Sequence, residues 1–308
     1  MRHFLHLNDL SKEDILYLVE LASRLKKEAK KGFYFPYLKN KALGLIFTKA
    51  STRTRVSFEV GIHQLGGYSL YLGKNDLQLG RGETIEDTAK VLSRYLDLIV
   101  IRTYEQKEVE EFAKYSSIPV INGLTDDYHP TQIIADFQTI FEEKGRLSNL
   151  KIAYVGDGNN VAATLLVGAA KLGLEIAIAT PPGYEIKKEV VDFALDEAKK
   201  NKSNVIFTEN PKEAVKDADV VYTDTWVSMG QEEEKEKRIR DFEGYQVDSS
   251  LLRLAKDDAI FLHCLPAYRG FEVTSDVIDG PQSRVFDEAE NRLHAHKAIM
   301  IFVSLGKI

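Results

Sequence analysis

Apolar residues along the chain form short unbroken runs that alternate with longer stretches in which they recur every three or four positions. A short apolar run rich in β-branched residues is typical of a buried strand, whereas the longer spacing is typical of an amphipathic helix. In the first half of the chain the runs predict strands at residues 42–47, 68–72, 98–101 and 118–122. The longer spacing predicts helices at residues 53–65, 84–95, 105–115 and 131–144.

The second half of the chain repeats this alternation. Strands are predicted at residues 151–157, 175–180, 205–208, 219–222 and 259–262, and helices at residues 159–172, 187–200 and 212–216. Because a helical crossover joins parallel strands, the alternation predicts parallel sheets. The pattern is interrupted by charge, glycine and asparagine at residues 145–150. We therefore expect an α/β protein with two doubly wound parallel-sheet domains of similar size that join there.

Composition narrows the class of protein. The length of 308 residues suits two domains, and 44% hydrophobic with 29% charged residues is ordinary for a soluble globular chain. No stretch approaches the roughly 18 unbroken apolar residues of a membrane span, and the first ten residues resemble neither a secretory nor a transit signal. We expect a cytoplasmic protein without membrane contact.

Charge and cysteine content exclude two further classes. The chain has 41 basic and 47 acidic residues, a net charge of −6, which disfavours a nucleic-acid binder that needs a broad basic face. Cys264 is the single cysteine, so it forms no intrachain disulfide and offers no cysteine cluster for zinc or iron–sulfur chemistry. We expect no metal and no cofactor.

The residues STRTR, at positions 51–55, lie between a predicted strand and a predicted helix. Together Lys49, Arg53 and Arg55 place three positive charges within seven residues. The start of a helix carries partial positive charge, so cations are unfavourable there and a bound phosphate would remove the conflict. The alternative is an ordinary helix capped by Ser51 with exposed arginines.

A second junction follows the strand predicted at 118–122. The residues His129, Pro130, Thr131 and Gln132 precede an apolar helical pattern, and Pro130 fits a first-turn position. Ligands bind at the carboxyl ends of parallel strands, where a His and a Gln can donate to a carbonyl or phosphate oxygen. A structural histidine near a helix cap remains the alternative.

The segment 156–161 imitates part of a dinucleotide-binding fingerprint. Gly156 and Gly158 match its first two glycines, but Val161 stands where the third belongs, although Glu175 lies near the expected acidic position. This partial match suggests a nicotinamide-dependent oxidoreductase as an alternative function. The amides of the asparagines at 159 and 160 would instead suit a small carboxylate.

Two loops follow strands of the second half. In DTWVSMG, residues 224–230, Asp224 and Ser228 can accept hydrogen bonds from an ammonium group. In HCLPAYRG, residues 263–270, Leu265 and Pro266 predict an extended turn, with or without a cis bond, that exposes backbone carbonyls. Cys264 is either part of this site or a buried small hydrophobe.

A charged stretch at residues 231–243 stands apart. It carries six acidic and four basic residues, with opposite charges at helical spacing in the pairs Glu233–Lys237, Glu234–Arg238 and Glu236–Arg240. A solvated loop or helix face is the simpler interpretation, and a mobile lid is the alternative because of the DTWVSMG loop before it.

Taken together, STRTR, HPTQ, DTWVSMG and HCLPAYRG in this order resemble the transcarbamoylases, the aspartate/ornithine carbamoyltransferase family. The likeness covers nearly the whole chain, and the Ser-Met-Gly and HCLP segments resemble the ornithine branch. It implies a carbamoyl phosphate domain at 1–145, an amino-acid domain at 146–287 and a cleft that closes between them. It also implies that a C-terminal helix, within 288–308, returns to the first domain.

The resemblance also implies roles for single residues. The phosphate would be held by Ser51, Thr52, Arg53, Thr54 and Arg102. The carbamoyl group would be contacted by Thr54, Arg102, His129, Gln132, Arg292 and the backbone carbonyls of Cys264 and Leu265. Gln78 would enter a neighbouring subunit's site, which implies a homotrimer or an assembly of trimers. Ornithine would be held by Asn160 and the Met229 backbone at its carboxylate and by Asp224 and Ser228 at its α-amine.

The reaction implied is transfer of the carbamoyl group to the δ-amine of L-ornithine, giving L-citrulline and phosphate without a covalent enzyme intermediate. Arg102, Thr54 and His129 would stabilise the oxyanion, and Asp224 and Cys264 would help to select the neutral amine. This activity serves arginine biosynthesis or catabolism. The alternatives are a carbamoyltransferase for N-acylornithine or putrescine, the oxidoreductase named above, and a binding protein without catalysis.

Overall fold

The computed structural model describes residues 2–77 and 82–308. The chain divides into two compact units. Unit 1 comprises Met1–Gln138 and Glu290–Ile308, and unit 2 comprises Thr139–Ala289. Among the described residues, no helix combines the length and the apolar character needed to cross a membrane.

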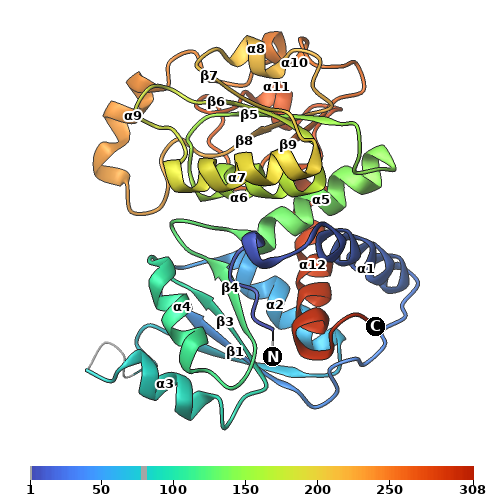
Figure 1. The fold of residues 1–308 in the computed structure, drawn as a ribbon, viewed down its shortest axis with the longest axis vertical. Helices are drawn as coiled ribbons and strands as arrows, with labels where there is room; N and C mark the ends of the chain where they lie inside the picture. The colour runs from blue at the N-terminus through green and yellow to red at the C-terminus, as the bar shows by residue number, and fades with distance from the viewer. Residues whose placement is uncertain (1, 78–81) are drawn as a thin grey trace. The chain divides into compact units, whose positions relative to one another are not determined.

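Unit 1 is built on a four-stranded parallel sheet in the order β2-β1-β3-β4. Helices α3 and α4 cover one face of this sheet, and α2 lies on the other face together with α12 (Figure 1). The elements in chain order are η1 (Leu7–Asp9), α1 (Lys12–Lys30), β1 (Ala42–Phe47), α2 (Thr52–Gln64), β2 (Tyr68–Gly73), α3 (Ile85–Leu92), β3 (Leu98–Arg102), α4 (Gln106–Tyr115), β4 (Val120–Leu124) and α5 (Pro130–Lys144), whose last turns belong to unit 2.

Unit 2 contains a five-stranded parallel sheet in the order β7-β6-β5-β8-β9. Helices α6 and α7 lie on one face and α8, α10 and α11 on the other (Figure 1). The elements are β5 (Lys151–Val155), α6 (Asn160–Leu172), β6 (Glu175–Ala179), α7 (Lys188–Asn201), β7 (Val205–Thr208), α8 (Pro211–Val215), β8 (Val220–Thr223), η3 (Glu232–Glu234), α9 (Lys235–Asp241), α10 (Ser249–Leu252), β9 (Ile260–Leu262), α11 (Ser275–Ile278) and α12 (Val285–Leu305), which ends in unit 1.

The predicted fold class is confirmed, since both sheets are parallel and carry helices on both faces. The return of the C-terminal helix to the first unit is also confirmed, because the part of α12 after Ala289 belongs to unit 1. The α1 helix was not predicted, although Ser11 and Asp14 form a capping box at its start. The helix predicted at 84–95 is shorter than expected, because it ends in a tight turn after Leu92.

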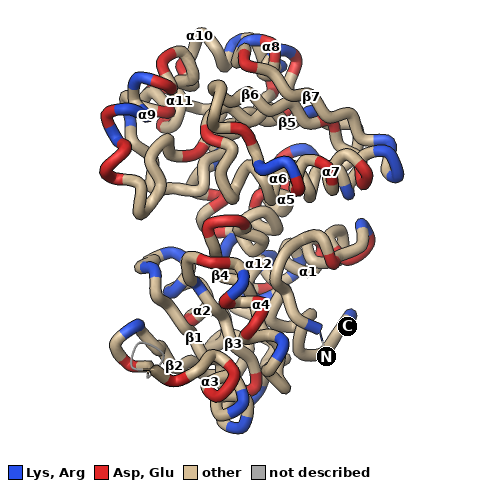
Figure 2. The backbone as a smooth tube through the Cα atoms, turned by 60° about the vertical axis from the view of Figure 1, so that its left-hand side comes forward, with Lys and Arg blue, Asp and Glu red and all other residues tan. Residues whose placement is uncertain are grey.

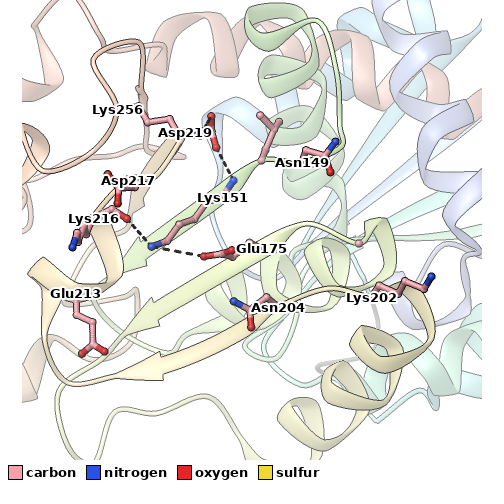
Figure 3. Close-up of a pocket in the computed structure, with 12 residues that line it drawn as sticks. Asn149, Lys151, Glu175, Lys202, Asn204, Glu213, Lys216, Asp217, Asp219 and Lys256 are labelled. Carbon is pink, nitrogen blue, oxygen red and sulfur yellow. Dashed lines mark hydrogen bonds and ion pairs between the residues drawn. The ribbon is translucent and has the colours of Figure 1, made fainter.

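Each sheet is braced in the same way at its amino edge. In unit 1, Asp97 accepts hydrogen bonds from the backbone N–H of Ala42 (2.9 Å) and from Lys41 (2.7 Å). In unit 2, Asp219 accepts from the backbone N–H of Lys151 (2.8 Å) and from Lys256 (2.8 Å), as Figure 3 shows in part. These aspartates satisfy the first donors of the central strands, which would otherwise lack partners in the sheet.

Candidate active site

The first turn of α2 follows β1 directly. Ser51 caps the helix by accepting from the backbone N–H of Thr54 (3.2 Å), as the capping alternative expected. Two nearby cations have acidic partners: buried Lys49 pairs with Asp126, and Arg55 donates to Glu59 (3.1 Å). The sequence predicted that all three cations contribute to an anion site, but Lys49 and Arg55 already have acidic partners.

Arg292, on α12, joins several unit 1 residues that the sequence singled out. Its guanidinium group donates to the Thr54 hydroxyl (2.8 Å) and to the side-chain oxygen of Gln132. Its Nε also donates to His296 (3.2 Å). Arg292, Thr54 and Gln132 are each at most 3% exposed. The side chains therefore form one buried, cation-centred cluster that spans α2, α5 and α12.

His129 and Arg102 extend this cluster. Arg102 is the last residue of β3 and follows a register shift against β4 between Ile101 and Arg102. Burial, followed by the charges of Arg292 and Arg102, lowers the pKa of His129 well below its usual 6.5. His129 is therefore a neutral imidazole at pH 7, which can donate a single N–H without itself carrying charge.

In unit 2 the turn between β5 and α6 carries the predicted asparagines. Asn159 caps α6 by accepting from the backbone N–H groups of Val161 (3.0 Å) and Ala162 (3.1 Å). Its amide group donates to Asp224 (2.8 Å), which lies just after β8. Asn160 is the first residue of α6. This turn thus places an asparagine amide and a carboxylate at the carboxyl edge of the sheet, where ligands bind in α/β folds.

The second glycine of the partial fingerprint, Gly158, allows two segments of the protein's own backbone to pack closely. A Cβ atom at Gly158 would lie 2.5 Å from the backbone nitrogen of Ile186 and 2.5 Å from the carbonyl oxygen of Tyr184. In a dinucleotide site the second glycine allows the pyrophosphate to approach. Here the backbone of residues 184–186, in the same unit, occupies the space next to Gly158, which argues against a nicotinamide cofactor.

The HCLP segment contains a buried histidine of defined tautomer. The backbone N–H of Leu265 donates to Nδ1 of His263 (2.9 Å), so the proton of the neutral ring lies on Nε2 and points to Glu272 (3.0 Å). The Leu265–Pro266 bond is cis, as the sequence allowed. Leu265 itself has φ 58°, however, so the extended conformation expected before proline is wrong at this residue.

Cys264 is half-buried and donates its S–H toward Asp224 (3.3 Å). The side chains of Asp224, His263 and Cys264 offer possible metal-ligand atoms within 4.8 Å of one another. Both ring nitrogens of His263 are engaged by Leu265 and Glu272, so the imidazole presents no lone pair to a metal. The group is better described as an acid with a thiol neighbour.

The charged stretch after Ser228 and Met229 forms η3, which consists of three glutamates, and α9, which carries both basic and acidic residues (Figure 2). Of the predicted pairs, Glu234–Arg238 is present at 3.0 Å. Arg238 is only 7% exposed and also donates to Asp157 (2.9 Å) and to the carbonyl of Trp226 (3.0 Å). The expectation of a solvated face is wrong for this residue.

Asp157 titrates unusually because of its position beneath α9. Burial raises its pKa from 3.8 to about 6, and Arg238 offsets only part of this effect. A carboxyl group so deeply buried with one cationic partner is partly protonated near neutral pH. The sequence offered no sign of this, because Asp157 and Arg238 are far apart in the chain.

The predicted site residues thus divide between the units. Ser51, Thr52, Arg53, Thr54, Arg102, His129, Gln132 and Arg292 lie in unit 1. Asn160, Asp224, Ser228, Met229, Cys264 and Leu265 lie in unit 2. Gln78 lies outside the described residues. The sequence did not indicate Ser57, His296 or Glu272, and it indicated Arg238 only as a partner of Glu234. The spacing of four residues between Arg292 and His296 was the one local signal available.

A separate hollow of about 650 Å³ lies in unit 2 at the amino ends of the strands (Figure 3). Lysines and acids alternate around it, and Lys151 donates to the carbonyl of Lys216 (2.6 Å) while facing Glu175 (3.8 Å). Ligands of parallel sheets bind at the opposite, carboxyl edge. This hollow therefore lies at the edge of the sheet opposite to the predicted site residues of unit 2.

Comparison with known proteins identifies the family of the chain. Residues 2–142 match the carbamoyl-P binding domain of the aspartate/ornithine carbamoyltransferases, and residues 148–303 match their Asp/Orn binding domain. The ornithine carbamoyltransferase of Caldicellulosiruptor saccharolyticus is 86% identical over 308 residues, covering 100% of both chains. That of Nitratiruptor is 57% identical over 303 residues, 98% of each chain.

Solved structures give the same result. The ornithine carbamoyltransferase from Pyrococcus furiosus matches with a TM-score of 0.96 and 51% identity, covering 100% of this chain and 98% of that one. The anabolic enzyme from Campylobacter jejuni matches with a TM-score of 0.93 and 46% identity, covering 98% and 99%. On the motifs, the fold and these full-length matches, the chain belongs to the aspartate/ornithine carbamoyltransferase family.

Proposed function

We propose that this chain transfers the carbamoyl group of carbamoyl phosphate to the δ-amine of L-ornithine, forming L-citrulline and phosphate. The observation that carries the proposal is the buried cationic cluster of unit 1, built around Arg292 on the STRTR and HPTQ segments. The 86% identity to a curated ornithine carbamoyltransferase over the full length supports the same reaction.

The phosphate of the substrate binds at the start of α2. Ser51 and Thr52 supply hydroxyl groups, and Arg53 and Arg102 supply positive charge next to the N–H groups of the first turn. A dianion is favourable at this position for the same reason that a cation is unfavourable. As the carbon–oxygen bond to phosphate breaks, charge grows on the leaving group, and the arginines stabilise that charge.

The carbamoyl group binds next to the phosphate. Arg102, Thr54 and the neutral His129 donate to its carbonyl oxygen, Gln132 binds its amide, and Arg292 approaches the oxygen from α12. The low pKa of His129 supports a role as a neutral donor rather than a general acid. The backbone carbonyls of Cys264 and Leu265 accept from the carbamoyl NH₂ and the incoming amine.

Ornithine binds at the acidic edge of unit 2. Its α-ammonium group pairs with Asp224 and Ser228, and its carboxylate accepts from Asn160 and the Met229 backbone. Asp224 is 5% exposed and is already oriented by Asn159, so it is ready to bind an ammonium group. Aspartate as second substrate would bring an extra carboxylate to this acidic environment, which makes it a poor fit.

The reaction is direct attack of the neutral δ-amine on the carbamoyl carbon through a tetrahedral intermediate. An amine with a pKa near about 10.4 is neutral in only about one molecule in a few thousand at pH 7. Turnover therefore rises with pH toward the alkaline range. Rates that stay flat from about pH 6 to pH 9 at saturating carbamoyl phosphate would contradict attack by the free base.

The test is an assay of product release with ornithine, putrescine, aspartate and N-acetylornithine in parallel, each with wild type and Arg53→Ala. Activity with ornithine alone, reduced about a hundredfold in the variant, is the expected result. If putrescine or N-acetylornithine were the preferred substrate, that compound and not ornithine would be the carbamoyl acceptor. Thermal stabilisation by NAD⁺ but not by phosphate would favour the oxidoreductase instead.

We further propose a cytoplasmic homotrimer, or an assembly of trimers, that acts in arginine biosynthesis. The anabolic description of the Campylobacter jejuni relative supports the direction. Exposed apolar side chains on α2 and the edge strand β2 support a subunit contact there: Val56, Val60, Tyr68 and Leu70. Gln78 follows β2 in the chain, and its insertion into a neighbouring subunit remains a prediction. Sedimentation analysis of wild type and Leu70→Lys tests the assembly.

A further inference from the structure

We propose that His296 is a positioning residue for the carbamoyl phosphate site, because its imidazole holds the Arg292 guanidinium group against Thr54 and Gln132. This inference rests on the function proposed above, in which Arg292 binds the carbamoyl group. His296 has no place among the motif residues. Its partner Arg292 lies on the same helix, and its partner Ser57 lies on α2, far away in the chain.

The hydrogen-bond chain through His296 has a single direction. The Nε–H of Arg292 can only donate, so Nε2 of His296, 3.2 Å away, is the acceptor. A neutral imidazole that accepts at Nε2 carries its proton on Nδ1. That Nδ1–H donates to the hydroxyl of Ser57 at 2.9 Å. Ser57 in turn donates to the backbone carbonyl of Arg53 or of Thr54 (3.2 Å).

The ring of His296 is fixed by packing as well as by hydrogen bonds. It is fully buried and stacks on Phe58, with ring centroids 3.8 Å apart and an interplanar angle of 11°. Gly61 lets α12 approach α2 closely, since a Cβ atom there would lie 3.1 Å from Met300 and 3.3 Å from Lys297. The helix that carries the phosphate-binding turn therefore also sets the plane of the imidazole.

Fixing Nε of Arg292 fixes the orientation of the whole guanidinium plane, because the group is rigid and flat. Its two terminal nitrogens then point to Gln132 and to Thr54 (2.8 Å). A protonated His296 would turn an N–H toward the Arg292 N–H and break the arrangement. Burial and the charge of Arg292 lower the pKa of His296 well below 6.5, which keeps the acceptor in place.

Three substitutions of His296 distinguish its role as a hydrogen-bond acceptor from its role in packing. In His296→Gln, the amide oxygen can occupy the place of Nε2 and still accept from Arg292. In His296→Asn, the amide reaches only the place of Nδ1, on the Ser57 side. In His296→Phe, the stack on Phe58 is kept and the acceptor is lost. His294→Phe is the matched control, since His294 is buried on the same helix with its Nε2 toward Glu290 (3.7 Å).

We expect kcat/KM for carbamoyl phosphate to fall about tenfold to a hundredfold in the Asn and Phe variants. His296→Gln should recover most of this loss, and His294→Phe should stay within about threefold of wild type. The affinity for inorganic phosphate should change less than about twofold in all four, because phosphate contacts the turn of α2 rather than Arg292.

Equal losses in the Gln, Asn and Phe variants, or a parallel loss of phosphate affinity, would overturn the proposal in favour of a packing role. So would a crystal structure of His296→Phe in which Arg292 still contacts both Thr54 and Gln132. That structure decides the positioning role whatever reaction the protein catalyses. Absence of citrulline formation by wild type would contradict the proposed function alone.

Discussion

Each unit contains a buried histidine, and the charges next to these two histidines have opposite signs. In unit 1, His296 accepts a hydrogen bond from a cation, Arg292, and carries its proton on Nδ1. In unit 2, His263 donates to a carboxylate, Glu272, and carries its proton on Nε2. Burial is equally complete at both positions. The sign of the neighbouring charge therefore decides the tautomer, and burial does not.

The same contrast governs the other titratable groups. In unit 1, burial and nearby arginines lower the pKa of His129, so a base is kept neutral. In unit 2, burial and nearby carboxylates raise the pKa values of Tyr154 and Asp157, so these acids keep their protons to higher pH. The predicted site residues thus lie in cationic surroundings in unit 1 and in acidic surroundings in unit 2, as the proposed binding of a phosphorylated substrate and of an ammonium group requires.

The largest effect that would break this contrast is loss of a cation in unit 1. Arg102→Met should lower kcat for citrulline formation at least about a hundredfold, because one oxyanion donor stabilises the transition state by about 3 kcal/mol. Arg55→Met is the matched control, since Arg55 already pairs with Glu59 and lies over the ring of Tyr71 at 3.6 Å. A loss below about fivefold in Arg102→Met would remove Arg102 from the reaction.

The acidic character of unit 2 is tested by stability against pH. The folded-state pKa of Asp157 is about 6, above the 3.8 of an unperturbed aspartate. The folded protein therefore binds this proton more tightly than the unfolded chain does. The resulting contribution to the free energy of unfolding is fully present below about pH 4 and is lost as pH rises through 6. This contribution amounts to about 3 kcal/mol.

Asp157→Asn should accordingly flatten the dependence of unfolding free energy on pH between about 4 and 6.5 relative to wild type. Denaturant unfolding at several pH values measures the two curves. Glu236→Gln, at an exposed position of α9, controls for a change of charge alone. Parallel curves for wild type and Asp157→Asn would show that Asp157 ionises normally.

A smaller effect distinguishes the two substrates. Asp224→Asn should raise KM for ornithine about tenfold to a hundredfold, because a charge-assisted hydrogen bond to the ammonium group is lost while the contact with Asn159 can be kept. The affinity for inorganic phosphate should stay within about twofold. If phosphate affinity falls as far as ornithine affinity, the assignment of one substrate to each unit is wrong.

The smallest effect concerns the thiol. Cys264→Ala should reduce kcat/KM for ornithine only about twofold to fivefold, because an S–H is a weak donor to Asp224 at 3.3 Å. Steady-state kinetics with both substrates measures it. Full activity in this variant would reduce the Cys264 side chain to packing, and a loss above about a hundredfold would give it a chemical role.

Local pattern was sufficient for most of the fold. All six residues of β1 are buried, so a continuous apolar run predicted a strand covered on both faces. Arg102 and Asp224 were placed at strand ends for the same reason, because the residue after a buried run emerges at the sheet edge. Local pattern also held the signal for α1 in its capping box, although the apolar runs did not predict this helix.

The sequence by itself determined the alternation of strands and helices, the parallel sheets and the motif residues at their edges, because these depend on neighbours within a few positions. Only the tertiary structure decided the proton positions of His263 and His296, the burial of Arg238 and the raised pKa of Asp157. Each of these depends on which groups face one another: Ser57 and His296 are 239 residues apart, and Asp157 and Arg238 are 81 apart. Hydrogen-bond direction and ionisation are properties of such contacts, and chain order does not encode them locally.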